Sequence, residues 1–138
     1  MEVIKWRQAY STGIAWIDEE HRTLVGLIDR LYQALRDRKG EEVIVEVCNA
    51  VIAYTEYHFA NEEEAMAAYP AREEHRAEHT RMKARVVELQ GQLSGDCRQA
   101  AEQLYRFLRQ WLINHIQGSD FKYVPYLQPP SAGSENTA

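Results

Sequence analysis

The segment HRAEH, residues 75–79, places His75 and His79 four positions apart. On a helix this spacing puts both imidazoles on one face, where they can bind the same metal ion. The remaining histidines of the chain are His21, His58 and His115. Five imidazoles that meet at one place would suit a metal centre, so the elements that position them decide the chemistry.

Two carboxylates accompany the histidines. Glu62 lies four residues after His58, so both side chains point the same way from a helix. Asp120 lies five residues after His115, and on a continuous α-helix this spacing would turn it about 140° away. We expect Gly118 to end the helix, which would allow the chain to turn Asp120 back beside His115.

The sequence predicts an all-α protein. Apolar residues at helical spacing indicate one helix from near Asp18 to near Gly40 and three more over residues 41–67, 71–93 and 96–117. The side chain of Asp18 is expected to cap the first helix. Short connections make consecutive helices antiparallel, so we expect an antiparallel up-down-up-down four-helix bundle.

Other segments complete the expected domain. Residues 1–16 are rich in aromatic side chains, and we expect an N-terminal arm that packs on the bundle. Residues 128–138 are polar and contain two prolines, so they are expected to form a loose, disordered tail after a domain of residues 1–127. The apolar stripe of the second helix is expected to consist of Val43, Val47, Val51, Tyr54 and Met66.

All five histidines fall on the inward stripes of these helices. A single histidine on an apolar face is usually a core residue with a hydrogen-bonded ring. Five would each need a partner, because an unpaired buried polar group costs about 1–3 kcal/mol, and one shared metal centre would satisfy them all. In an up-down-up-down bundle the histidines, Glu62 and Asp120 are all expected at the same end.

Two kinds of metal centre fit parts of this pattern. HRAEH matches the H-x-x-E-H motif of zinc proteases, with Glu78 as the base. A catalytic zinc site uses three protein ligands, which would leave unexplained His21, His58, Glu62 and His115. We expect Glu78 at the wet edge of its face. Seven ligands suit two ions instead, and histidine with carboxylate favours iron or manganese. If Glu62 and Asp120 bridge two such ions together with one oxygen, one coordination position stays open for a small ligand.

The ligand balance favours a binding protein over an enzyme. Carboxylate-rich di-iron proteins use paired Glu-x-x-His motifs, and this sequence contains none. Five imidazoles and two carboxylates suit reversible binding of O₂ better than its activation.

Composition narrows the class further. The chain has 138 residues, a net charge of −5 and 45% hydrophobic residues, as expected of a single globular domain. Its basic residues are scattered, so we expect no nucleic-acid partner. No apolar run is long enough for a membrane segment, and the first residues lack the apolar core of a secretory signal. Cys48 and Cys97 are expected to be free thiols in a reducing compartment, and the location is expected to be cytoplasmic.

The sequence resembles the hemerythrins, and most closely the single-domain bacterial ones. The matching segments are IDEEHRTL around His21, HFANEEEAM around His58 and Glu62, HRAEH, and WLINHIQGSDFKY around His115 and Asp120. The resemblance covers residues 16–126 and implies a four-helix bundle that binds O₂ reversibly at a non-haem di-iron centre, as a carrier or store.

The resemblance also implies the role of each residue. The implied ligands are His75, His79 and His115 for one iron, His21 and His58 for the other, and Glu62 and Asp120 as bridges. An oxo or hydroxo group would complete the bridge. O₂ would bind at the vacant position and become a hydroperoxide by taking two electrons from the iron pair and the proton of the bridge. Leu112 matches the family's leucine over the O₂ pocket, with Trp111 beside it. The segment MAAYPAREEH between the second and third helices is slightly shorter than the family pattern, so we expect a tighter turn and an intact site.

Other functions stay open. The same centre could serve an oxygen or redox sensor module, or a metal-dependent enzyme such as a di-iron oxidase, a peroxidase or a zinc hydrolase. A metal-free structural bundle would tolerate loss of His21 or His58. The sequence indicates no particular protein partner, and it leaves the oligomeric state open, with a monomer as one option.

Overall fold

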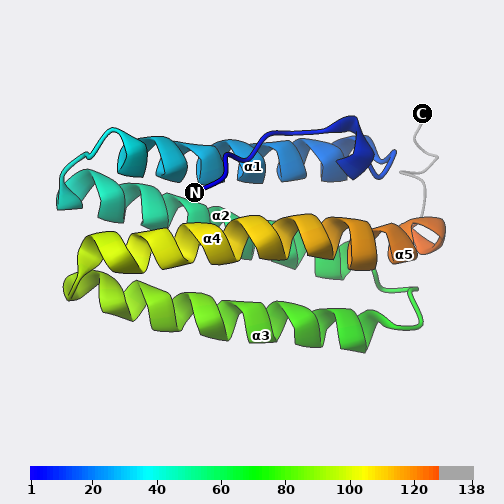
Figure 1. The fold of residues 1–138 in the computed structure, drawn as a ribbon. Coiled ribbons are helices and arrows are strands. Elements are labelled where there is room, and N and C mark those ends of the chain that lie inside the picture. Colours follow the sequence, from blue (N-terminus) through cyan, green and yellow to red (C-terminus); the bar gives the residue numbers. More distant parts are fainter. Residues whose placement is uncertain (128–138) are drawn as a thin grey trace.

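The computed structural model describes residues 1–127. Its four long helices are α1 (Ala15–Arg36), α2 (Glu41–Ala65), α3 (Arg72–Gly91) and α4 (Cys97–His115). Consecutive helices run in opposite directions and are joined by short turns at the two ends of the bundle (Figure 1). The part of the chain that the structure describes contains no strand, so the predicted all-α, up-down-up-down bundle is confirmed. The expected tail, residues 128–138, lies outside the described residues.

Shorter elements flank the four helices. They are the 3₁₀-helices Gln8–Tyr10, Gln92–Ser94 and Val124–Tyr126, the π-helix Ile116–Asp120 and the single turn α5 (Phe121–Tyr123). The helix starts follow from local sequence. The carboxylate of Asp96 accepts a hydrogen bond of 3.1 Å from the backbone N–H of Gln99, which caps α4. Pro70 lies in the turn between α2 and α3, where its ring disfavours a helix across the connection.

The predicted cap of the first helix is wrong. Helix α1 begins at Ala15, so Asp18 lies inside its first turn. Its carboxylate instead accepts hydrogen bonds from the preceding loop, from the Ser11 hydroxyl at 2.6 Å and from the Thr12 N–H and hydroxyl, both at 2.8 Å. Burial tends to raise the pKa of the Asp18 carboxyl, but these bonds and one from Gly13 outweigh burial and lower it. Asp18 therefore ties the N-terminal arm to α1.

The arm packs on the bundle as expected. Ile4 and Tyr10 are buried in the main core. The guanidinium of Arg22 lies 4.8 Å from the ring centroid of Trp6, which is cation–π geometry. The hydroxyl of Tyr105 donates a hydrogen bond to the carbonyl of Glu2. These contacts hold the arm along the outside of α1 and α4.

The predicted stripe of α2 is partly wrong. Val43 is 40% exposed, and Ile44 is buried in its place. Positions 43 and 44 precede Val47 by four and three residues, and both spacings fit one helix face. Local periodicity cannot choose between them, whereas packing against α1 and α4 does. The buried side chains of α2 are Ile44, Val47, Cys48, Val51, Thr55, His58, Phe59 and Glu62.

Polar burial is concentrated at one end of the bundle. Among residues 1–127, nine polar or charged side chains are buried, and seven of them are the predicted metal ligands. The remainder of the core is apolar, and Cys48 and Cys97 are buried within it as free thiols. No helix in the described part of the chain combines the length and the apolar character needed to cross a membrane.

Candidate metal centre

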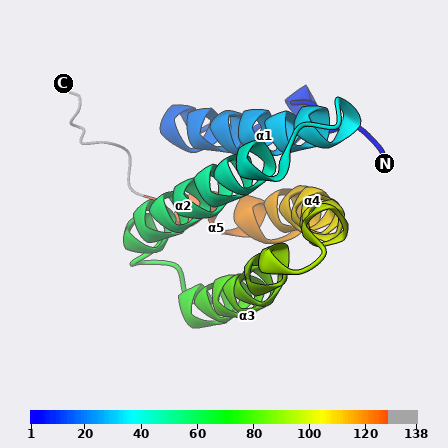
Figure 2. The same cartoon turned by 90° about the vertical axis from the view of Figure 1, so that its left-hand side faces the viewer.

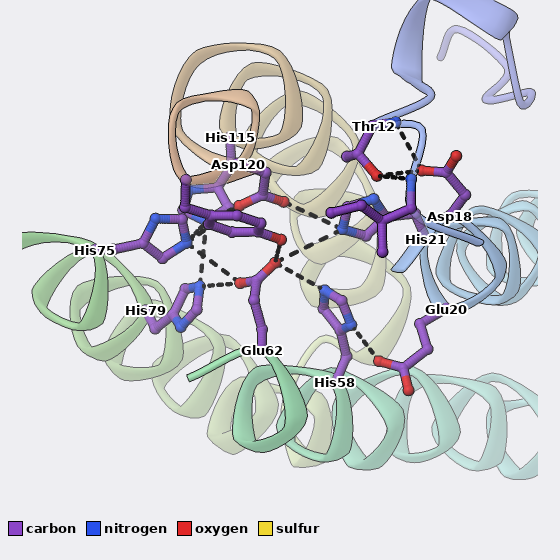
Figure 3. A network of polar contacts seen from close by, with 12 residues as sticks. Thr12, Asp18, Glu20, His21, His58, Glu62, His75, His79, His115 and Asp120 are labelled. Atoms are coloured by element: carbon purple, nitrogen blue, oxygen red, sulfur yellow. Dashed lines mark hydrogen bonds and ion pairs between the residues drawn. The ribbon is translucent and has the colours of Figure 1, made fainter. Parts of the chain in front are cut away.

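The helix directions place every predicted ligand at one end of the bundle. His21 lies near the start of α1, and His75 and His79 near the start of α3. His58 lies near the end of α2, and His115 is the last residue of α4. In an antiparallel bundle these four places are adjacent, and their side chains converge on one point (Figure 3).

Asp120 reaches this point by a different route from the one predicted. The predicted end of the helix at Gly118 is wrong, because the π-helix Ile116–Asp120 continues directly from α4. In a π-helix each N–H bonds to the carbonyl five residues back, so residues five apart lie nearly above one another. The Oδ1 atom of Asp120 is therefore 3.1 Å from Nε2 of His115. The spacing that seemed unsuitable for an α-helix fits this π turn.

Three histidines and one carboxylate oxygen form the first of two ligand groups. Nε2 of His115 lies 3.0 Å from Nε2 of His75 and 3.2 Å from Nε2 of His79. Glu62 Oε1 lies 3.2 Å from Nε2 of His75 and 2.9 Å from Nε2 of His79. The ligand atoms of all four residues lie within 4.8 Å of one another, so one ion could contact them all.

Two histidines and two carboxylates form the second group. Nε2 of His21 lies 3.1 Å from Asp120 Oδ2. Nε2 of His58 lies 3.4 Å from Glu62 Oε2. These ligand atoms also lie within 4.8 Å of one another. The second group thus has one histidine fewer than the first.

The two carboxylates connect the groups. Glu62 directs Oε1 toward His75 and His79, and Oε2 toward His58. Asp120 directs Oδ1 toward His75 and His115, and Oδ2 toward His21. Each carboxylate therefore offers one oxygen to each group, which is the arrangement of a residue that bridges two ions.

Unpaired buried atoms show that the cluster fits a metal. Both ring nitrogens of His21 and the Oδ1 atom of Asp120 are buried without a hydrogen-bond partner in the described structure. Nε2 of His21 lies 3.1 Å from Asp120 Oδ2, as in an ion pair, but the two atoms do not form a hydrogen bond. Several unpaired lone pairs that face one dry point are costly, and a cation there would satisfy them together.

The negative charge of the carboxylates in the cluster also favours a cation at this point. Burial favours a neutral imidazole, yet the carboxylates of Glu20 and Glu62 outweigh it and raise the pKa of His58 to about 10. Asp120 and Glu62 likewise overcome burial and raise the pKa of His75 to about 9. The site therefore attracts positive charge, and a metal ion would compete with protons for these nitrogens.

Three acids outside the ligand set orient the histidines. The Nδ1 atoms of His58, His79 and His115 lie 2.6, 2.8 and 2.9 Å from carboxylate oxygens of Glu20, Glu63 and Glu78, respectively. An Nδ1–H that donates to a carboxylate leaves the Nε2 lone pair free for a metal. Asn61 donates to Glu20 at 2.9 Å and the Ser119 hydroxyl donates to Glu78 at 2.7 Å, which fixes these two acids.

Sequence reasoning missed these acids. Glu78 is 35% exposed, as expected at the wet edge of its face, yet it lies 2.9 Å from Nδ1 of His115, and Glu63 accepts a hydrogen bond from Nδ1 of His79. A sequence signal was available, because Glu20, Glu63 and Glu78 each adjoin a predicted ligand in the chain.

Tyr123 is the last residue of the matching segment WLINHIQGSDFKY, but the sequence predicted no role for it. Its hydroxyl donates a 2.6 Å hydrogen bond to Glu62 Oε2, and its ring lies 5.4 Å from that of His75. It is fully buried with Ile17 and Met66 in a small second cluster. It lies beyond the last predicted helix, and only the turn α5 brings it back to the centre.

Aromatic rings cover the three-histidine group. Phe59 stacks on His79 with ring centroids 3.7 Å apart, and Trp111 stacks on His115 at 4.1 Å. Trp111 also lies 5.6 Å from Phe59, and Leu112 is buried in the core beside it. These side chains exclude water from the bundle side of the cluster.

Comparisons with known proteins agree with this geometry. The family model "Hemerythrin HHE cation binding domain" matches residues 12–127. A bacteriohemerythrin of Stenotrophomonas maltophilia is 34% identical over 90% of this chain and 81% of its own. A bacteriohemerythrin of Methylococcus capsulatus is 28% identical over 92% of this chain and 98% of its own.

More distant proteins also match over most of their length. A myohemerythrin of Theromyzon tessulatum is 27% identical over 88% of this chain and 92% of its own. A solved structure, described as that of a leucine-to-phenylalanine mutant, superposes with a TM-score of 0.78 at 27% identity. The superposition covers 91% of this chain and 97% of the solved one.

Proposed function

The chain belongs to the hemerythrin family, and from this premise we propose that it binds O₂ reversibly at a di-iron centre. In this role it would carry or store the gas. Two ferrous ions would give two electrons to O₂ when it binds. The same electrons would return to the ions when O₂ is released. The side chains around the ions would bind them, orient them and keep water away.

The division of the ligands into two unequal groups supports this proposal most directly. His75, His79 and His115 would hold one ion, and His21 and His58 the other, while Glu62 and Asp120 bridge the pair. Each carboxylate offers one oxygen to each group. The ion with two histidines would keep an open position, which is where a small ligand could bind.

The surroundings favour binding over catalysis. Glu20, Glu63 and Glu78, the acids beside the ligands, are all engaged with imidazole Nδ1 atoms, so none of them is a free acid or base for turnover. Trp111 and Leu112 lie on the core side of the ligand cluster, where we propose that they line the O₂ pocket. A dry, apolar pocket would keep out the water and the additional proton with which the bound gas would leave as hydrogen peroxide, and so preserve reversibility.

Loading with iron tests the proposal. The protein is incubated with Fe(II) without oxygen, the metal content is measured, and air is then admitted. We expect two irons per chain and a visible absorption band that disappears again when O₂ is removed. His21→Ala and His58→Ala should lose the band, whereas Glu64→Gln, on an exposed neighbour of the site, should keep it. A single zinc per chain, or continuous consumption of O₂, would contradict the proposal.

A further inference from the structure

A small cavity opens between α2 and α3, which are neighbours along the bundle (Figure 2). Residues of both helices line it, namely Ile52, Thr55 and Glu56 of α2 and Met82, Lys83, Val86 and Val87 of α3. We call this cavity the α2–α3 fissure. Thr55, Met82 and Val86 are buried, whereas Val87 is 60% exposed. The fissure therefore extends from the surface at Val87 into the core.

Four of the seven lining residues of the fissure are apolar, and its two charged residues, Glu56 and Lys83, are exposed and half-buried, respectively. Its buried polar member is Thr55, whose hydroxyl already donates a 2.8 Å hydrogen bond to the carbonyl of Val51. An ordered water needs two to four polar partners, and apolar cavities of proteins stay dry and take up small apolar molecules. The fissure thus favours an apolar occupant over water.

The size of the fissure limits that occupant. Its volume is about 20 Å³, and a cavity needs about 10–15 Å³ by this measure to hold one water-sized molecule. One diatomic molecule fits, and a larger organic ligand does not.

The inner end of the fissure adjoins the metal centre. Thr55 is three residues before His58, and Met82 is three residues after His79. Side chains three apart on a helix are surface neighbours. Phe59, four after Thr55, stacks on His79, so the helix face that carries Thr55 also carries a side chain in contact with the ligand cluster.

We propose that the α2–α3 fissure binds one small apolar molecule and is the route by which O₂ passes between solvent and the metal centre. The identity of the gas rests on the proposed function, but the binding site itself does not. A route of this kind affects the association rate and the dissociation rate of O₂ equally, because the gas crosses the same barrier on entry and on exit.

Xenon tests the site independently of iron chemistry. Crystals of the iron-loaded protein are pressurised with xenon, and we expect one atom bound against Thr55, Met82 and Val86. Val86→Leu adds a methylene to the lining and should abolish this binding. Circular dichroism of the variant confirms that it is folded. A fissure without xenon in protein that binds O₂ normally would overturn the proposal and leave the proposed function intact.

Oxygen kinetics test the route. Val87→Trp places a large side chain at the mouth of the fissure, on an exposed position that tolerates it. We expect association and dissociation of O₂ to slow by the same factor, several-fold, with no change in the equilibrium constant. Val43→Trp, on the exposed face near the start of α2 and away from the fissure, is the matched control and should leave both rates unchanged.

The outcomes separate the two proposals. Unchanged rates in Val87→Trp would overturn the fissure as the route. If wild type and Val43→Trp both fail to bind O₂ while xenon occupies the fissure, the proposed function fails and the site for a small apolar molecule stands.

Discussion

The hydroxyl of Tyr123 donates a 2.6 Å hydrogen bond to Oε2 of Glu62, the carboxylate shared by the two ligand groups. That oxygen faces the two-histidine group through His58. A hydrogen bond to a carboxylate withdraws negative charge from it. Tyr123 can therefore adjust the electron donation of Glu62 to the ion that would have the open position.

Removal of this hydroxyl should change the redox behaviour of the loaded protein. In Tyr123→Phe, Glu62 becomes a stronger donor and favours ferric over ferrous iron. We expect a lower midpoint potential and faster autoxidation, together with a loss of about 1–2 kcal/mol of stability for the broken buried hydrogen bond. Redox titration, the decay of the O₂-dependent absorption band and urea unfolding measure these effects. Tyr126→Phe, on an exposed tyrosine, is the control, and an equal effect there would refute the role of Tyr123.

The hydrogen bond between His79 and Glu63 should strengthen metal binding. Glu63→Gln keeps the shape of the side chain but removes the negative charge that orients the imidazole. We expect iron affinity to fall by about 10- to 100-fold, as is usual for such partners of ligating histidines. Competition with a chelator measures the affinity. Glu64→Gln changes the adjacent, exposed glutamate and should have no effect, so equal affinities for the two variants would contradict the prediction.

The position of Asp120 should depend on the register that the π-helix sets. Insertion of one alanine after Gly118 would place the aspartate six residues after His115 and turn it about a further 100° around the helix, and we expect loss of the second iron with little change in helix content. Gly118→Ala should keep both irons, because an added Cβ at this position meets no atom within 4 Å. Metal analysis and circular dichroism distinguish the two variants. Retention of both irons after the insertion would show that the register of the π turn is not needed.

Asp18 should make the stability of the protein depend on acid pH. Its folded pKa is lowered, so its contribution is present above the unfolded value of about 3.9 and is lost as the pH falls through the folded value. Asp18→Asn should therefore lower the free energy of unfolding by about 1.5–3 kcal/mol at neutral pH. The difference from wild type should shrink below about pH 4.

Urea unfolding at several pH values checks this dependence, with metal loading held the same in all samples. Asp37→Asn is the control, since the side chain of Asp37 is 47% exposed and its removal should cost little at any pH. A difference between Asp18→Asn and wild type that stays constant down to pH 3 would rule out the carboxylate as its source.

Local pattern was sufficient for the bundle and for the list of candidate ligands. Helix periodicity is a property of neighbouring residues, so apolar spacing indicated four helices and placed all five histidines on their inner faces. The order of the helices then brought the histidines and Glu62 to one end. Where two positions fit one face equally, as Val43 and Ile44 do, the sequence alone gave the wrong one.

Tertiary structure decided how the ligands are arranged. The donation from Tyr123 to Glu62 and the pairing of His58 with Glu20 join residues 61 and 38 positions apart. The orientation of each Glu62 oxygen depends on contacts with histidines, some of them on other helices. Such contacts depend on the rotation and axial shift of one helix against another, which packing of the whole core sets and no local spacing records. The π turn before Asp120 likewise depends on packing and is not recorded by local spacing. A sequence pattern can indicate which side chains face inward, but only the packed bundle determines which atoms of those side chains meet.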